Sequence, residues 1–221
     1  MKILLQLSAL LFLVFAGCHG FGINCHGIGV RGSGVTKEET RKLEDFNAID
    51  AGGAYNIEIV CGKSPEVTIY GEDNILPLIR TEVSDQTLHI YNRKSISPRR
   101  KIRIQISTNN IEKINASGAS DISISNINND RFDVDASGAG KMNISGKTNY
   151  IALSLSGAVK VNARDLISDN ANVEISGASK AEVYASKELR AEISGVGSLD
   201  YYGNPEKVKR NISGVGSINQ R

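Results

Sequence analysis

A short motif built around a Ser-Gly pair recurs six times in the second half of the chain, at intervals of 20, 19, 20, 18 and 19 residues. Around each pair the frame is apolar, any, apolar, Ser, Gly, Ala or Val, any, any, apolar, any, apolar, as in INASGASDISI at 114–124. Such near-constant spacing is typical of a repeat architecture, in which each unit buries its apolar face against its neighbours. The six pairs are Ser117-Gly118, Ser137-Gly138, Ser156-Gly157, Ser176-Gly177, Ser194-Gly195 and Ser213-Gly214.

The spacing and the alternation of the repeat together predict its fold. Apolar and polar residues alternate on both sides of each corner, which is the pattern of short, half-buried strands. If successive repeats stack as coils about 4.8 Å apart, Ile114 and Ile122 meet equivalent apolar residues inside, while Asn115 and Asp121 face water. A thin core also fits the composition, because only 5% of the residues are aromatic and none is tryptophan. We therefore predict an all-β fold, a parallel β-helix or β-solenoid whose repeats are close to 19 residues long.

An antiparallel meander is the alternative fold. In a meander the Ser-Gly corners would be hairpin turns, and each unit would hold a second turn, near 126–130, 146–149 or 185–188. Turns in such folds usually recur every 8 to 12 residues or about that, so the longer unit favours stacked coils. The handedness of the coils stays open.

The corner residues have a structural explanation. Glycine suits a sharp turn that needs a positive φ, and stacked corners would crowd any Cβ atom. Serine can hydrogen-bond backbone groups at a bend, and the following Ala or Val can fill a small inward pocket. A serine nucleophile needs a base, but the only histidines are His19, His26 and His89, of which two lie in a Gly-rich segment. We therefore predict structural turns, with no catalytic residue, no metal site and no cofactor.

The first half of the mature chain also has period-two runs. An echo of the repeat, IDAGGAYNIEI at 49–59, carries Gly52 in the serine position, and Pro77 argues against a long helix in the ambiguous segment 75–81. We divide the domain 37–221 into an N-terminal part, 37–108, and the six repeats, 109–221. The strands predicted in the N-terminal part are 56–60, 66–70, 87–91 and 101–107.

The first residues have the features of an export signal, so we predict a signal peptide at 1–17. Lys2 precedes an apolar run that is shorter than the roughly 20 residues needed to span a membrane. Phe-Ala-Gly-Cys at 15–18 resembles a bacterial lipobox, which predicts lipidation of Cys18; ordinary cleavage nearby is the alternative. Residues 18–36 are rich in glycine, and we predict that they form a flexible tether.

Nucleotides and nucleic acids are not expected partners. GIGVRG at 27–32 matches the dinucleotide fingerprint only formally, because no predicted strand precedes it and no helical pattern follows. The net charge of +2 is close to balanced, whereas a nucleic-acid binder carries a basic surplus. One basic run, RKSISPRRKIR at 93–103, indicates either a patch for an acidic partner such as an anionic glycan or lipid, or a solvated loop leading into an edge strand, where Lys and Arg discourage aggregation.

Two clusters in the repeats have a functional and a structural interpretation. Asp130, Asp133 and Asp135 carry enough oxygens to suggest calcium, but the segment lacks the known calcium-loop spacings and equally fits a solvated acidic face. Tyr201 and Tyr202 precede a turn. They indicate either an exposed aromatic contact for sugars or one buried and one exposed tyrosine.

Two cysteines remain if Cys18 is lipidated. Cys25 and Cys61 could form a disulfide in an exported protein. Cys25 lies in the Gly-rich segment and Cys61 closes a predicted strand, so the pairing stays open.

Four segments of the chain resemble the head GIN domain family, whose members are described as putative auto-transporter adhesins and occur largely in Bacteroidota. The resemblance spans about 33–219, and it implies a β-helical fold similar to that of pectin lyases, without lyase or acyltransferase catalytic residues. It also implies a role in adhesion, but it assigns no functional residue. The segments are GSGVTKEETRKLEDFNAIDAGGAYNIEI, YGEDNILPLIRTEV, the SGA corners and YYGNPEKVKRNISGVGSINQ.

We therefore expect an exported, non-catalytic β-solenoid that serves as an adhesin or surface binding module for an unknown glycan or protein ligand. The lipid anchor would hold it to the cell envelope, as an outer-membrane lipoprotein on either side of that membrane. One alternative is a structural protein of the periplasm or envelope. Another is a carbohydrate-active enzyme, which would need acidic calcium ligands and a basic residue in one groove. The sequence shows no such set, and the oligomeric state stays open.

Overall fold

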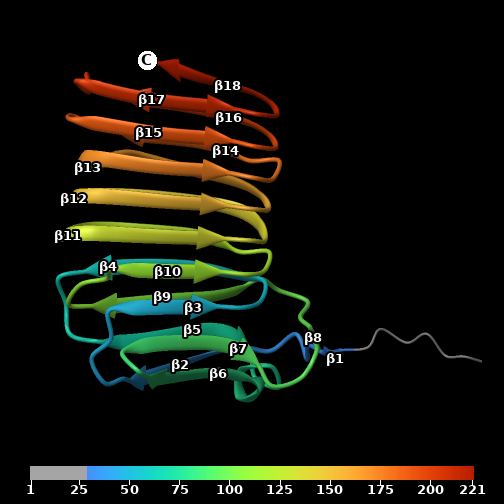
Figure 1. Ribbon diagram of the computed structural model, residues 1–221. Helices are drawn as coiled ribbons and strands as arrows, with labels where there is room; N and C mark the ends of the chain where they lie inside the picture. Colours follow the sequence, from blue (N-terminus) through green and yellow to red (C-terminus); the bar gives the residue numbers. More distant parts are fainter. Residues whose placement is uncertain (1–28) are drawn as a thin grey trace, which may run out of the picture.

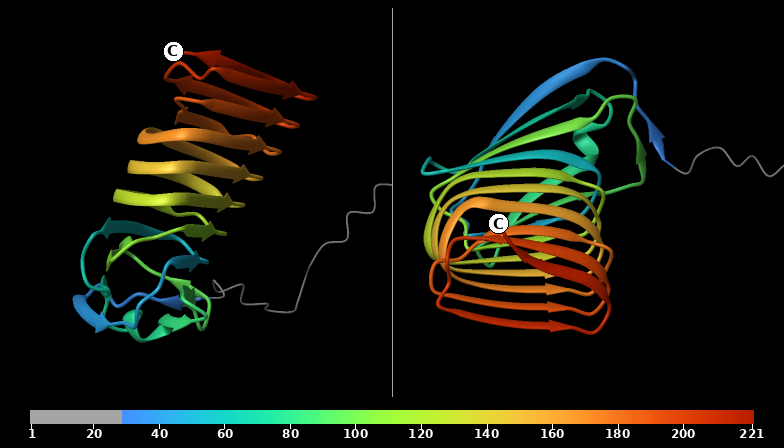
Figure 2. Two further views of the ribbon diagram at one scale, coloured as in Figure 1. Left: turned by 60° about the vertical axis from the view of Figure 1, so that its left-hand side comes forward. Right: turned by 90° about the horizontal axis from the view of Figure 1, so that it is seen from above.

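The computed structural model describes residues 29–221, which form an all-β solenoid of about five turns (Figure 1). The predicted signal peptide, 1–17, and Cys18 and Cys25 lie outside the described residues. Within the described residues no helix has the length and hydrophobicity of a membrane-spanning segment. Seen along the stack, the coils superimpose as flattened loops with two broad faces (Figure 2).

Each coil contributes one strand to each face. We name the face whose strands precede the Ser-Gly corner the first face, and the face whose strands follow it the second face. The two meet at the corner edge and, opposite, at the far edge. β11 Asp121–Ala136, β12 Ala139–Leu155 and β13 Ala158–Ile175 continue around the far edge and belong to both faces. The other first-face strands are β3 Ala48–Ala51, β10 Lys113–Ala116, β15 Glu188–Ile193 and β17 Lys207–Ile212; the other second-face strands are β4 Tyr55–Cys61, β14 Lys180–Tyr184, β16 Val196–Tyr202 and β18 Val215–Gln220.

All strands of the repeats pair in parallel with the equivalent strands of the next coil. On the first face Ile114 pairs with Val134, and Val134 with Leu153. On the second face Ile122 pairs with Met142. These residues are buried, so the apolar positions of successive repeats form continuous ladders in the core. The predicted stack of coils is confirmed, and the meander alternative is wrong for the repeats.

The predicted echo of the repeat also forms a coil. Ile49 of β3 pairs with Ile114, and Ile57 of β4 pairs with Ile122. The carbonyl of Gly53 accepts a hydrogen bond from the N–H of Ala119, 2.8 Å away. The stack of corners therefore starts one coil before the first Ser-Gly pair.

Close contact between successive corners explains the glycine in each of them. A Cβ atom on Gly138 would lie 1.8 Å from the carbonyl oxygen of Gly118, and the corresponding distance is 2.3 Å or less at the other repeats. The same carbonyl accepts the N–H of Ala139 at 2.8 Å. Each corner thus receives a backbone hydrogen bond through the space that a side chain would fill.

Three details of the predicted corner differ from the structure. The corner glycines do not have positive φ values, so crowding alone requires them. The Ala or Val after each glycine faces outward, with Val196 62% and Val215 74% exposed, and fills no inward pocket. The corner serines are exposed, and their backbone N–H groups, not their hydroxyls, bond the preceding coil, as Ser137 does to Ala116.

The far edge bends without ending the strands. The register between β11 and β12 shifts between Ile124 and Ile127, and that between β12 and β13 shifts between Asn143 and Ser145. Such bulges bend a strand and strengthen its twist. The second turns expected near 126–130 and 146–149 are therefore bends within one long strand.

The N-terminal end of the stack is closed by antiparallel strands. On the second face the order continues from β4 to β9, β5 and β2, and on the first face from β3 to β7 and β6. The four predicted strands are confirmed, and the segment 75–81 divides into a short 3₁₀ helix and the start of β6. The strands of this end are β2 Thr36–Lys42, β5 Glu66–Glu72, β6 Ile79–Ser84, β7 Thr87–Asn92 and β9 Ile102–Thr108.

The predicted tether, 18–36, extends too far into the domain. β1 Val30–Arg31 pairs in parallel with β8 Ile96–Ser97, and Thr36 begins β2. The reason is Glu72, whose buried carboxylate accepts the N–H of Gly34 at 2.6 Å. A buried carboxylate needs such donors, and residues 29–36 supply them.

The last described coil is polar and exposed. β17 pairs only with β15, and β18 only with β16. Arg210 takes the inward position that Ala191 holds one coil earlier, and Gln220 takes that of Tyr201. The inward residue Val208 is 36% exposed. Lysines on β17 protect this open edge against pairing with other strands, as is common for edge strands.

The corner contacts predict unequal costs for the two corner residues. Gly138→Ala should lower the free energy of unfolding by about 2 kcal/mol or more, because the new Cβ displaces the coil beneath. Ser137→Ala should change it by less than about 0.5 kcal/mol, because the hydroxyl is exposed. Urea unfolding of the two variants measures both values. Equal costs would contradict the role of backbone contact at the corner.

Candidate functional site

The corner serines form a line and not an active centre. Ser117, Ser137 and Ser156 lie at the ends of strands that pair in register, so each stands beside the next along the corner edge. All six are exposed. His89, the histidine of the described residues, lies on β7 with its Nδ1 3.3 Å from Asp50. In this arrangement the serines present a row of hydroxyls to solvent.

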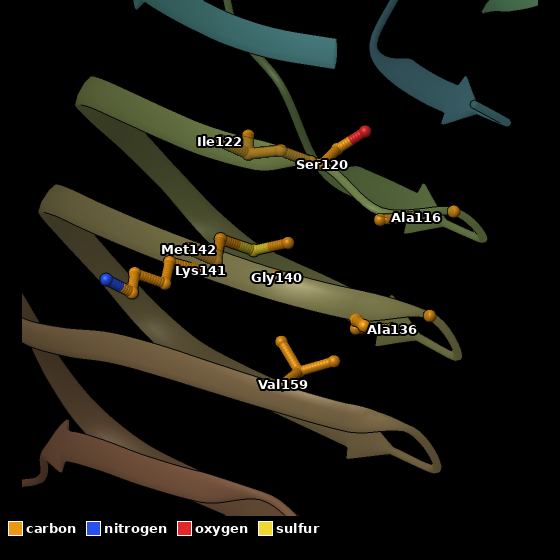
Figure 3. Close-up of a pocket in the computed structure, with 11 residues that line it drawn as sticks. Ala116, Ser120, Ile122, Ala136, Gly140, Lys141, Met142 and Val159 are labelled. Carbon is orange, nitrogen blue, oxygen red and sulfur yellow. The ribbon is translucent and has the colours of Figure 1, made fainter. Parts of the chain in front are cut away.

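A small cavity lies inside the corner edge. It measures about 10 Å³ and is lined by residues from three successive coils (Figure 3). Ala116 and Ala136 stand beside the corners, and Met142 and Val159 fill the space between the coils. A volume of this size holds at most about one water molecule. Ligands larger than water must therefore bind on the outer surface.

Outward side chains form ladders because the coils are in register. The second face carries a basic ladder, Lys141, Lys160 and Lys180, next to Asp121. The first face carries an acidic and polar ladder beside it in the repeat frame. Its members are Asn115, Asp135, Ser154, Glu174, Glu192 and Asn211.

The largest hollow among those that the described residues form lies on the far edge. It has a volume of about 380 Å³ and spans three coils. Asn128, Lys147 and Ile167 stand in register on one side. Asn149 and Asp169 contribute to the other side. We call this the far-edge hollow; it is lined by Asn128, Asn129, Lys147, Thr148, Asn149, Ile167, Ser168 and Asp169.

The polar groups of the far-edge hollow are held by neighbouring coils. The amide of Asn149 donates to Asp130 at 2.7 Å. Lys187 donates to Asp169 at 2.8 Å, as does the hydroxyl of Ser186. The hydrogen bonds from Lys187 and then Ser186 hold the pKa of Asp169 below its usual value. The hollow thus offers fixed amide, ammonium and carboxylate groups, together with the exposed side chain of Ile167.

Two smaller hollows lie on the first face. One, of about 190 Å³, is lined by Ser154, Glu174 and Glu192 with the corner serines beside them. The other, of about 270 Å³, is lined by Arg190, Glu192 and residues of β17. The first face therefore changes from acidic to basic toward the C-terminal coil.

The predicted aspartate cluster is divided between two surfaces. Asp133 and Asp135 share the outer side of the first face, as expected for residues two apart in a strand. Arg131 donates to Asp133 at 2.9 Å. Asp130 instead accepts from Asn149 at the far edge. No group of three or more potential metal ligands occurs within residues 29–221.

The two adjacent tyrosines differ in exposure. Tyr201 is buried, and the guanidinium of Arg210 lies 5.3 Å from the centre of its ring. Tyr202 is half-buried, with the guanidinium of Arg164 5.4 Å from its ring. Both rings are thus covered by arginines of neighbouring coils.

A buried carboxylate that the sequence reasoning missed lies beside these tyrosines. Asp200 accepts hydrogen bonds from Asn219 at 3.3 Å and Arg221 at 3.1 Å, and Lys180 lies 3.2 Å away. Burial alone would raise the pKa of Asp200, but these three donors together hold it below its usual value. The position could have been found from the repeat frame, because Asp200 stands one coil above Glu182.

The basic run at 93–103 does not lead into an edge strand, so that interpretation is wrong. β9 lies between β4 and β5 and is paired on both sides. Arg103 stacks over Tyr70, 5.2 Å from the ring centre, and Lys101 lies 3.9 Å from Asp121. The residues before them remain exposed.

Cys61 is buried at the end of β4. Burial raises the pKa of its thiol to about 11, and a backbone hydrogen bond to Ile111 opposes this rise. Because Cys25 lies outside the described residues, the pairing of the two cysteines stays a prediction.

Comparisons with known proteins agree with this fold. A family model described as putative auto-transporter adhesin, head GIN domain, matches residues 45–205. A putative adhesin from Bacteroides fragilis is 29% identical with a TM-score of 0.71, and 87% of this chain covers 100% of that one. A putative adhesin from Parabacteroides distasonis is 20% identical with a TM-score of 0.56, over 87% and 100% of the two chains. A search of curated proteins finds no match. Since the solved relatives consist of this domain alone, the solenoid folds independently in them.

The contacts of Asp200 predict a pH-dependent stability. Asp200→Asn should lower the melting temperature at pH 7 by about 3 °C or more, because Lys180 and Arg221 lose their carboxylate. A lowered pKa in the folded state stabilises the protein above the ordinary pKa of about 4, and this contribution is lost as the pH falls through the folded value. Thermal unfolding followed by circular dichroism at neutral and acidic pH tests this. The control Asp135→Asn, on the open first face, should have little effect at either pH. An Asp200→Asn effect that persists unchanged at acidic pH would contradict the assignment.

Proposed function

Because the chain belongs to the putative auto-transporter adhesin, head GIN domain family, we propose that it is an exported, non-catalytic adhesin that binds glycans along its far edge. The family and its solved relatives are named as adhesins, which supports the general role. The anchor proposed for it is a lipid on Cys18, in the outer membrane. Catalysis and cofactors have no part in this proposal.

The observation that carries the proposal is the in-register polar lining of the far-edge hollow. Asn128 and Lys147 stand one coil apart on the same side, and Asn149 and Asp169 stand one coil apart on the other. A glycan is a chain of similar units with many hydroxyls, and a surface of similar rungs can bind successive units in the same way. Amide and carboxylate groups satisfy those hydroxyls, while a few apolar atoms contact the sugar ring.

The geometry of the hollow favours binding without reorganisation. Its polar groups are already fixed by hydrogen bonds to neighbouring coils, such as that between Asn149 and Asp130. Fixed groups lose little side-chain entropy when a ligand binds. The exposed side chain of Ile167 gives one apolar contact among the polar ones. Shallow, open binding of this kind suits an extended polysaccharide at a cell surface.

A glycan array with a protein of residues 19–221 tests the proposal. We expect binding to a defined subset of glycans. Asn128→Ala combined with Asn149→Ala should weaken it at least about fivefold, because each lost hydrogen bond contributes roughly 1 kcal/mol. The matched control replaces Asn143 and Asn162, two outward asparagines of the second face. It should bind as the unchanged protein does.

Three results would contradict the proposal. Equal loss in the two double variants would place the binding elsewhere. New reducing ends or unsaturated products from a polysaccharide panel would indicate a carbohydrate-active enzyme. Protease treatment of intact cells should release an adhesin; a protein spared by that treatment would be an internal structural component of the envelope.

A further inference from the structure

Five positive side chains gather at the N-terminal end of the solenoid, although the whole chain has only two more Lys and Arg than Asp and Glu. All five are exposed, and none takes part in an ion pair among the described residues. We call this group the basic collar; its members are Arg31, Arg93, Lys94, Arg99 and Arg100.

The backbone of the basic collar is held together across three segments. β1 and β8 pair so that Arg31 stands beside Ser97, and the N–H of Gly32 donates to Ser97 at 3.1 Å. Glu72 joins the other parts, because its carboxylate accepts the N–H of Gly34 at 2.6 Å and that of Arg99 at 2.8 Å. β1 and β8 lie side by side at the N-terminal end of the stack (Figure 1). The collar is thus built into the fold and does not depend on a free loop.

The nearest carboxylates in this part of the fold do not neutralise the collar through ion pairs. Glu72 is buried and takes up backbone N–H groups. Asp73 accepts the hydroxyl of Ser33 at 2.5 Å, and this bond lowers the pKa of Asp73. Both acids are therefore committed to holding the segments together. The charges of the collar remain directed to solvent.

We propose that the basic collar docks on anionic phosphate head groups of the membrane that carries the lipid anchor. The inference rests on the proposed lipidation of Cys18. Eleven residues separate Cys18 from Gly29, and such a segment reaches at most about 40 Å. Arginine presents a planar set of donors that matches phosphate oxygens, and clusters of four to eight basic residues beside an anchor, or about that number, are typical of binding to anionic lipids.

This contact orients the molecule. With the collar on the membrane, the N-terminal end faces the bilayer and the coils of the repeats lie farther from it. The far-edge hollow belongs to coils well beyond the collar, between β11 and β13. The collar would thereby keep the proposed glycan surface clear of the lipid. The anchor by itself supplies attachment but no orientation.

Vesicle binding by a protein of residues 19–221, which lacks the lipid, tests the inference. The probes are vesicles of phosphatidylcholine alone and vesicles containing about a third phosphatidylglycerol. We expect binding to the anionic vesicles only, measured by co-sedimentation, and its loss as the salt rises from about 25 mM to about 500 mM. Arg93→Gln, Lys94→Gln, Arg99→Gln and Arg100→Gln together should lower the partition coefficient at least about tenfold, since each basic residue near such a surface contributes roughly 1 kcal/mol.

A matched control separates position from total charge. It replaces Lys141, Lys160, Lys207 and Lys209 by glutamine, which removes the same number of positive charges from other parts of the stack. We expect this variant to retain binding within about twofold of the unchanged protein. Circular dichroism confirms that both variants are folded.

Several outcomes would overturn the inference. They are absence of binding to anionic vesicles at low salt, equal loss in the two variants, and equally tight binding of the collar to a dissolved acidic polysaccharide such as alginate. Failure of the proposed function is distinguishable, because the glycan array uses no membrane. Vesicle binding without glycan binding would leave the collar intact and remove the adhesin role, and the reverse result would remove only the collar.

Discussion

Backbone hydrogen bonds between successive coils determine the rest of this structure. At each corner the carbonyl of one glycine accepts an N–H from the coil above, as Gly118 does from Ala139 at 2.8 Å. The contact leaves no room for a side chain, because a Cβ on the next glycine would lie 1.8 Å from that carbonyl. Once the corners are fixed in this way, the strands on both faces must pair in register. The apolar ladders of the core and the polar ladders of the surface both follow from that register.

Much of the fold could be predicted because the constraint repeats. Ser117 and its five counterparts gave the length of the coil, and alternation gave the inward residues. The far-edge hollow could not be predicted, because bulges between Ile124 and Ile127 and between Asn143 and Ser145 change the sequence offset from the corner. Buried carboxylates were also missed, since their donors come from distant segments. Glu72, for example, is held by residues 34 and 99.

The two ends of the stack solve the problem of open strands differently. The N-terminal end reverses strand direction in β2, β5 and β6, which replaces the repeat by a closing layer. The last described coil keeps the parallel direction but places Arg210 and Gln220 where earlier coils have apolar residues. Arg210 then covers Tyr201. This asymmetry gives the molecule a basic, layered base and a series of equivalent rungs above it, so attachment and ligand binding can occupy separate parts of one chain.

The corner contact also governs which changes of length the protein tolerates. A duplication or deletion of one whole coil, such as the 19 residues from Gly138 to Ser156, would bring another glycine carbonyl opposite another N–H and preserve every ladder. An insertion of one residue in the strand would turn all following side chains to the opposite face. Evolution of such a chain can therefore extend its reach from the membrane only in steps of one rung.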